Sequence, residues 1–110
     1  MGVRLDKPWR ALTAANVAGL AAELGVYQLG DEQGRILRIG YAGGQTLFGL
    51  RSELEAALAA SEAALFRTEV NAQYLSRYEE LLMVHAADFG ALPEGNADDA
   101  RRRLGRLAPG

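Results

Sequence analysis

The stretch GVYQLGDEQGRILRIG, residues 25–40, decides the fold that this sequence predicts. Residues 25–30 and 35–42 are rich in valine, tyrosine, isoleucine and leucine, which favour strands. Between them, GDEQG supplies polar residues and Gly34, which suit the connection of a hairpin. The stretch therefore predicts two antiparallel strands.

The residues before the hairpin predict a helical arm. Trp9 is the single tryptophan, and its bulk favours packing of the arm against the body of the domain. Thr13 is a favourable N-cap, and the AANVAGLAAEL that follows it has helical composition interrupted at Gly19. We expect a first helix that ends near Gly25, so that residues 9–24 form the arm.

The residues after the hairpin predict a second helix and a third strand. Residues 47–65, LFGLRSELEAALAASEAAL, repeat apolar side chains at helical spacing. The stripe expected to face the sheet consists of Leu47, Leu50, Leu54, Ala57 and Leu58. Residues 66–71, FRTEVN, alternate large and polar side chains and predict a short strand.

A long amphipathic helix is predicted over residues 73–89. At about 100° per residue, one face of this helix gathers Tyr74, Leu75, Tyr78, Leu81, Leu82, His85 and Phe89. Because His85 lies on the apolar face, we interpret it as a core histidine instead of a ligand or a base. Gly90 ends the helix, ALPEGN forms a turn, and an arginine-rich helix is predicted over residues 98–107.

Together these elements predict a single α+β domain spanning residues 1–110, with its core at residues 25–96. The expected architecture is a small three-stranded antiparallel sheet flanked by helices, in the order α-ββαβα-α. A chain of 110 residues divided in two would leave each half too small to bury a core unaided.

Composition excludes several kinds of site. With no cysteine and one histidine, the chain has no disulfides, no thiolate metal sites and few options for zinc. No apolar run approaches the ~18 residues of a membrane span, and the N-terminal residues lack the apolar core of a signal peptide. We therefore expect a soluble, cytoplasmic protein with no membrane partner. The net charge of −2 gives no overall attraction to nucleic acid, so such binding needs a local patch.

Several motifs, in this order, resemble the GIY-YIG endonuclease superfamily. Gly-Val-Tyr at residues 25–27 opens the first hairpin strand, and Arg-Ile-Gly at residues 38–40 closes the second. An L-x-x-x-L helix, a strand beginning Phe-Arg at residues 66–67, and an E-x-x-L helix follow. LPEGN at residues 92–96 is similar to the Pro-x-x-Asn ending of small stand-alone members. The resemblance covers about residues 9–96 and implies a ββαβα core.

This resemblance implies a nuclease of the metal-assisted phosphodiester type. In the superfamily, two tyrosines help position and deprotonate the attacking water, an arginine steadies the phosphate and a glutamate holds a divalent ion. In-line displacement at phosphorus needs a deprotonated oxygen nucleophile, cationic stabilisation of the developing charge and a metal for the leaving oxygen. An active enzyme would therefore use Mg²⁺ or Mn²⁺.

Two positions of this sequence depart from the superfamily pattern. Tyr27 occupies the first tyrosine position, whereas Arg38 occupies the second. The helix pattern aligns best with residues 50–54, which puts Glu53 where the arginine belongs. Arg51 is the alternative arginine. Residues two apart on a helix lie about 160° around its axis, so Arg51 and Glu53 emerge on opposite flanks and only one of them faces the hairpin.

The resemblance also assigns a metal position and a late asparagine. Glu79 has Leu82 three residues on, as the superfamily helix does, and is the candidate metal ligand. One carboxylate alone makes a weak metal site, because Mg²⁺ held this way relies on substrate phosphates to complete its coordination shell. Asn96 matches the late asparagine, with a longer spacing from Glu79 than the usual pattern.

Two further charge features bear on function. The exchange of residue types suggests that Arg38 and Glu53 pair across the former active site and neutralise it. The strongest local positive charge is a C-terminal cluster, which is either a solvated helix end or a set of phosphate contacts: Arg101, Arg102, Arg103 and Arg106.

Three functions stay open from the sequence. The leading one is a domain with a degenerate nuclease centre that binds DNA, RNA or a protein. The alternative is an active divalent-metal endonuclease that keeps Tyr27 and Glu79 and takes its phosphate contact from Arg38 or Arg51. The third is a structural or self-associating protein. Loss of one transition-state donor commonly costs ~10² to 10³ in rate, and two changed positions favour the first reading.

Overall fold

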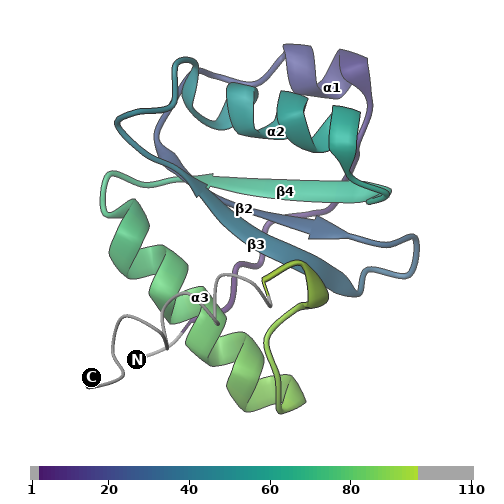
Figure 1. Cartoon of the computed structure of the whole chain (residues 1–110), viewed down its shortest axis with the longest axis vertical. Helices are drawn as coiled ribbons and strands as arrows, with labels where there is room; N and C mark the ends of the chain where they lie inside the picture. The colour runs from purple at the N-terminus through teal and green to yellow at the C-terminus, as the bar shows by residue number, and fades with distance from the viewer. Residues whose placement is uncertain (1–2, 97–110) are drawn as a thin grey trace, which may run out of the picture.

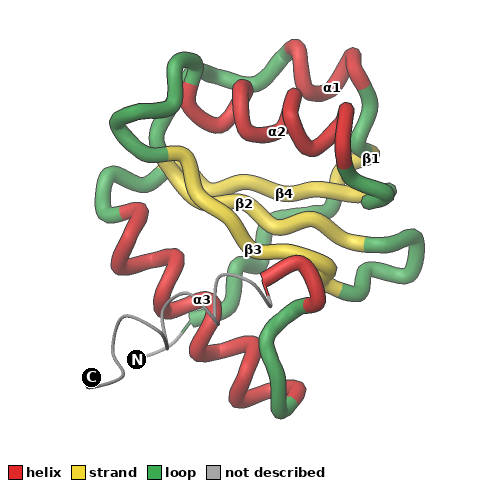
Figure 2. The backbone as a smooth tube through the Cα atoms, viewed as in Figure 1, coloured by secondary structure: helices red, strands yellow, loops and turns green. Residues whose placement is uncertain are grey.

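The computed structural model describes residues 3–96 and, within them, shows one sheet between two layers of helices (Figures 1 and 2). Its antiparallel sheet has the strand order β1-β4-β2-β3. The elements in chain order are β1 (Arg10–Ala11), α1 (Ala14–Ala18), β2 (Gly25–Gly30), β3 (Ile36–Ala42), α2 (Gly49–Ala60), β4 (Leu65–Val70), α3 (Tyr74–Phe89) and the 3₁₀ turn η1 (Glu94–Asn96). The predicted α+β class is confirmed.

Helices cover both faces of the sheet, with α1 and α2 on one face and α3 on the other (Figure 1). Side chains along a strand alternate between the two faces, so β2 supplies both layers. Tyr27 and Leu29 pack under α2, while Val26 packs under α3. Within residues 3–96, no helix is long and apolar enough to cross a membrane.

The predicted hairpin is confirmed as β2 and β3. Gly34 in its connection has φ of 83°, a left-handed conformation that glycine adopts without steric cost. Asp31 accepts hydrogen bonds from the backbone of Gln33 and Arg35, which closes the turn. A bulge between Leu29 and Gly30 shifts the register at the end of the hairpin.

The sheet has four strands instead of the three predicted. Two residues, Arg10 and Ala11, pair with Phe66 and Leu65 of β4 and form β1 at the edge of the sheet. A strand of two residues has no alternation to reveal it, so periodicity could not predict it. The third strand itself was expected at residues 66–71 and lies at Leu65–Val70.

The first helix is shorter than predicted. It spans Ala14–Ala18 and ends at Gly19 instead of continuing to residue 24. The Thr13 side chain caps it by accepting from the Asn16 amide, as expected. The chain then turns back, and the Glu23 carbonyl accepts from the Leu50 amide at 2.8 Å. This long-range hydrogen bond competes with the helix that the alanine-rich composition favours.

The apolar stripes of the longer helices are narrower than predicted. Leu50 and Leu54 of α2 are buried, but Leu47 precedes the helix and is 82% exposed, and Leu58 is also exposed. On α3 the buried side chains are Tyr78, Leu81, Leu82 and His85, while Leu75 and Phe89 are exposed. Gly90 ends α3 with φ of 78°, as expected. The helix predicted over residues 98–107 lies outside the described residues.

Trp9 packs the N-terminal arm against the sheet, as predicted. Its ring lies so close to Gly30 that a Cβ there would come within 2.8 Å of a ring carbon. Arg67 lies on β4, and its guanidinium carbon is 4.1 Å from the centre of the Trp9 indole ring. The tryptophan is therefore held between a glycine and an arginine.

Asn96 closes the outer edge of β3. Its side chain is fully buried, its Oδ1 accepts from the Ile39 amide and its Nδ2 donates to the Ile39 carbonyl, both at 2.8 Å. One side-chain amide thus replaces a neighbouring strand at this position.

A charged cluster ties β4 to α3. Arg77 donates to both carboxylate oxygens of Glu69, at 2.8 and 3.1 Å, and also to Glu80. Burial raises the pKa of Glu69, but the hydrogen bonds from Arg77 and Asn71 outweigh it, so the pKa of Glu69 lies below its usual value.

We expect Asn96→Ala to destabilise the fold by about 2 to 4 kcal/mol, because it leaves the buried N–H and C=O of Ile39 without partners. Urea unfolding at neutral pH measures the change. Gln45→Ala removes an exposed side-chain amide and serves as the control, with an expected change below about 0.5 kcal/mol. Equal midpoints for both variants would contradict the role given to Asn96.

We expect Glu69→Gln to destabilise the domain by about 2 kcal/mol at neutral pH, because the charge-assisted hydrogen bonds with Arg77 are lost. A lowered carboxylate pKa stabilises the fold above the unfolded-state value, and this contribution disappears as pH falls through the folded-state value. The difference between wild type and variant should therefore shrink in acid. Urea midpoints across an acid pH series test this, and a gap that does not change with pH would refute it.

Candidate functional site

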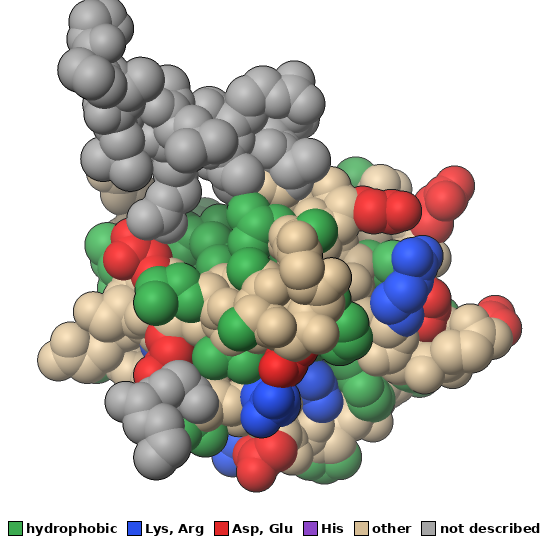
Figure 3. Space-filling view, turned by 90° about the horizontal axis from the view of Figure 1, so that it is seen from below, with side chains coloured by type: hydrophobic (Ala, Val, Ile, Leu, Met, Phe, Trp, Pro, Cys, Tyr) green, Lys and Arg blue, Asp and Glu red, His purple; other side chains and the backbone are tan. Residues whose placement is uncertain are grey.

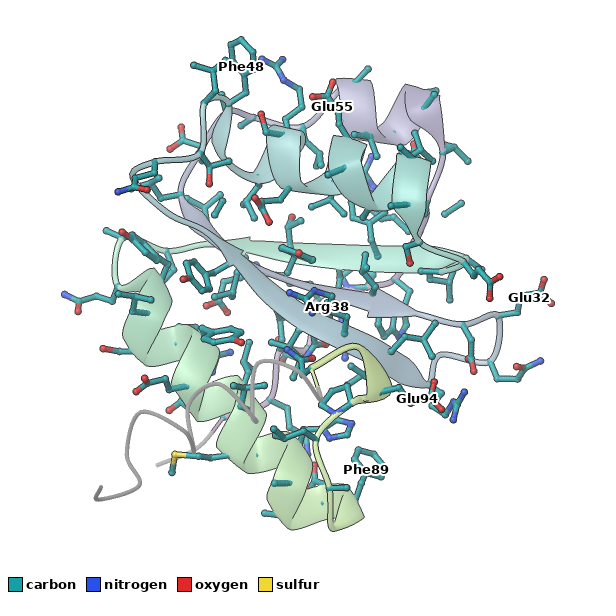
Figure 4. All side chains as sticks on the ribbon, in the orientation of Figure 1. Glu32, Arg38, Phe48, Glu55, Phe89 and Glu94 are labelled. Atoms are coloured by element: carbon teal, nitrogen blue, oxygen red, sulfur yellow. The ribbon has the colours of Figure 1, made fainter. Side chains whose placement is uncertain are left out.

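A groove lies between α2, the α2-facing side of the hairpin and the η1 turn, and we call it the Tyr27 groove. Its volume is about 510 Å³. In Figure 4, Arg38 lies on the sheet side of the groove and Glu94 lies on η1 near the end of β3. The lining residues are Tyr27, Leu29, Leu37, Arg38, Glu53, Ala56, Ala57, Ala60, Ser61, Glu94 and Gly95.

Tyr27 forms the floor of the groove. It is 4% exposed, and its Oη donates to Oε1 of Glu53 at 3.4 Å. Gly40 lies directly across the strand pair, where a Cβ would come within 2.3 Å of the tyrosine ring and hydroxyl. The glycine that ends Arg-Ile-Gly is therefore required by the tyrosine that ends Gly-Val-Tyr.

The environment of Tyr27 favours the protonated phenol. Burial is the largest cause that raises the pKa of Tyr27, and the charge and hydrogen bond of Glu53 raise it further. The hydrogen bond and charge of Arg38 act in the opposite direction without reversing the shift. At neutral pH, Tyr27 is thus a hydrogen-bond donor and a poor base.

Arg38 and Glu53 both line the groove, as the sequence suggested, but they are linked in another way. No ion pair joins them among residues 3–96. Arg38 donates from Nη1 to the Gly95 carbonyl, and both charged groups interact with the hydroxyl of Tyr27. The expected direct pair is replaced by a chain that runs through the tyrosine.

Arg51 lies outside the groove. Its guanidinium carbon is 5.1 Å from the centre of the Phe48 ring, which projects from the far side of α2 in Figure 4. Glu53 faces the hairpin instead. The two residues emerge on opposite flanks of the helix, as the helical geometry predicted.

Glu79 is not brought to the groove. It is exposed on α3, which packs on the opposite face of the sheet from Tyr27. Among residues 3–96, no three histidine, cysteine or acidic side chains gather in a way that could hold a metal ion. The residues of the Tyr27 groove therefore do not fit the Mg²⁺ or Mn²⁺ site that the resemblance implies.

The remaining predicted residues divide into structural and undescribed ones. Asn96 is committed to the β3 edge. His85 is a buried residue of α3, as predicted, with Nδ1 2.8 Å from the Ala91 carbonyl. Four arginines lie outside the described residues: Arg101, Arg102, Arg103 and Arg106.

Sequence comparison places the chain in a family. The profile of DUF7508, described as a domain of unknown function, matches residues 3–88. The chain belongs to the DUF7508 family. No curated protein and no solved structure matches it.

Sequence reasoning missed part of the groove of this DUF7508 domain. Glu94 and Gly95 close one end, and three alanines of α2 form a wall without large side chains. The Pro-Glu-Gly-Asn turn marks a chain reversal in the sequence, but its contact with Arg38 joins residues 57 positions apart. Local patterns carry no signal for such a contact.

We expect Tyr27 to ionise above the ordinary tyrosine pKa of 10.0, because burial and Glu53 favour its protonated form. A raised tyrosine pKa stabilises the fold fully below the ordinary value of 10.0, and this contribution is lost as pH rises toward the folded-state value. Absorbance titration of tyrosinate in wild type and Tyr27→Phe should show a late transition, above the ordinary tyrosine pKa, that is missing in the variant. Tyr41→Phe removes the hydroxyl of an exposed tyrosine and should leave this transition in place. The interpretation fails if Tyr27→Phe retains the late transition.

Proposed function

We propose that this DUF7508 domain is a GIY-YIG-like module that binds a basic protein segment in the Tyr27 groove and does not hydrolyse nucleic acid. The observation that carries the proposal is the hydrogen bond from Tyr27 to Glu53, 3.4 Å long, at the position where the superfamily pattern expects a tyrosine and an arginine. For hydrolysis, the hydroxyl of Tyr27 would have to be free to act on water, and the position of Glu53 would have to carry a positive charge.

The state of these groups argues against phosphodiester hydrolysis. A tyrosine that assists deprotonation of water needs a lowered pKa, whereas burial and Glu53 raise the pKa of Tyr27. Arg38 is engaged by the Gly95 carbonyl and Tyr27, so it is already committed within the protein. A carboxylate also repels the charge that develops on phosphorus oxygens.

The charges of the groove favour a cationic partner. The described lining has two carboxylates, Glu53 and Glu94, and one cation, Arg38. Phosphates would meet a net negative surface, whereas a lysine or arginine of a protein segment would meet complementary charge. Ala56, Ala57 and Ala60 keep the helical wall low, and a groove of about 510 Å³ has room for a few side chains.

We expect a fluorescent lysine-alanine peptide to bind the domain more tightly than a glutamate-alanine peptide of equal length. Glu53→Gln keeps the shape of the groove and should weaken lysine-peptide binding by about tenfold. Glu55→Gln is the matched control, because Glu55 lies on the same helix, points away from the groove in Figure 4 and does not line it. Fluorescence anisotropy at low and high salt measures both.

Three results would contradict the proposal. Equal binding of both peptides would remove the role of charge. Cleavage of single-stranded, duplex or branched DNA or of RNA in Mg²⁺ or Mn²⁺, lost in Tyr27→Phe, would establish the enzyme instead. Tighter binding of a nucleic acid than of the lysine peptide, with a steep salt dependence, would favour the nucleic-acid-binding alternative.

A further inference from the structure

A second cavity of about 600 Å³ lies on the opposite face of the sheet, and we call it the Gln28 cavity. It is lined by residues of β2, β3, β4, the second half of α3 and the segment that follows α3. Leu5, Leu81 and Leu92 supply apolar wall. Its size lies within the range of ordinary small-molecule sites, about 300 to 1,000 Å³.

Gln28 directs an unpartnered donor into this cavity. The residue is 3% exposed, and its Oε1 accepts from Nε of Arg67 at 2.7 Å. Its Nε2 has no hydrogen-bond partner among residues 3–96. Every fully buried side-chain nitrogen or oxygen of those residues has a partner, so Nε2 must keep some exposed area. Because Gln28 lines the cavity, Nε2 retains its small exposed area there.

Arg67 brings a cation without a paired carboxylate. Its Nε and Nη1 donate to Gln28 and to the Lys7 carbonyl, while its face stacks on Trp9. Nη2 has no acceptor, and no carboxylate lies within 4.0 Å of the guanidinium, among the described residues. Burial lowers the pKa of Arg67, and the charge of Asp6 offsets this only in part. A partly buried cation in this state is short of a counter-ion.

His85 adds a third polar group to the lining. A carbonyl oxygen only accepts hydrogen bonds, so the contact of 2.8 Å with Ala91 places a proton on Nδ1. Nε2 therefore remains available, as an acceptor in the neutral ring and as a donor in the charged one. The ring also packs against Phe89, with centroids 4.6 Å apart, which fixes its orientation.

The other charges of the lining are largely compensated. Arg4 pairs with Asp88 at 2.6 Å, and Arg35 pairs with Asp31 at 3.2 Å. Figure 3, seen from below, shows acidic and basic side chains interspersed among apolar ones. Glu94 is exposed and lines both the cavity and the Tyr27 groove. Arg67 is thus the arginine of the described lining with no carboxylate within 4.0 Å.

We propose that the Gln28 cavity binds a small carboxylic acid with an apolar body, its carboxylate held by Arg67 and Gln28 and its body packed on the leucines of α3 and the following segment. A single unpaired guanidinium matches a single negative charge, and its planar fork fits the two oxygens of a carboxylate. A phosphate monoester carries more charge and would need more donors. This site is separate from the Tyr27 groove, so either proposal can fail alone.

Octanoate, octanamide and octyl phosphate are matched probes with one apolar chain and three head groups. We expect octanoate to bind at least about tenfold more tightly than octanamide, and to shift the side-chain NH₂ resonances of Gln28 in the NMR spectrum of the full chain. Octanamide of equal affinity, a tighter octyl phosphate, or shifts that avoid Gln28 would each overturn the proposal.

Two variants test the site from different sides. Gln28→Glu places a carboxylate against Arg67 and should reduce octanoate binding by about tenfold or more. Val84→Phe fills the cavity from its α3 wall and should abolish binding. This variant tests the site independently if Gln28→Glu fails to fold. Met83→Phe adds a ring at an exposed neighbouring position and should leave binding unchanged. Unchanged octanoate affinity in folded Val84→Phe would overturn the proposal.

Discussion

The strand β2 lies between β3 and β4, and all six of its residues are buried. Its side chains therefore have to satisfy two different layers in alternation. Tyr27 and Leu29 enter an apolar layer under α1 and α2, while Val26 and Gln28 enter the layer under α3. A one-residue slip would exchange these sets, placing the tyrosine hydroxyl and the glutamine amide among the wrong partners. Both cavities inherit their chemistry from this register.

The two layers differ in kind. The layer under α2 is filled by apolar side chains, Phe66 among them, and its polar groups gather at one end around Tyr27. The layer under α3 carries polar residues along β4, where Arg67 meets Gln28 and Glu69 meets Arg77. Such groups are costly to bury unless each is paired. Arg77 is fully engaged by acids, whereas Arg67 is not, and this difference separates a structural arginine from a candidate binding residue.

How far the sequence predicts this molecule depends on the range of the interactions involved. The hairpin follows from local chemistry, since its residues and Gly34 suffice. The opposite flanks of Arg51 and Glu53 follow from helix geometry alone. The end of α1, the strand β1 and the contact of Arg38 with Gly95 depend on residues distant in the chain. Gln28 and Arg67 were missed because a polar residue in a strand usually faces water, and nothing local marks these as buried.

The side-chain amide of Asn96 affects whether two copies of the chain can associate through the edges of their sheets. A strand at the border of a sheet offers unpaired N–H and C=O groups that can recruit a further strand from another chain. Here the chain returns after α3 and covers the middle of that border with a single side chain, bonded twice to Ile39. The turn that closes one end of the Tyr27 groove is thus also a safeguard against edge-to-edge aggregation. The same few residues therefore shape the groove and cover the edge of the sheet.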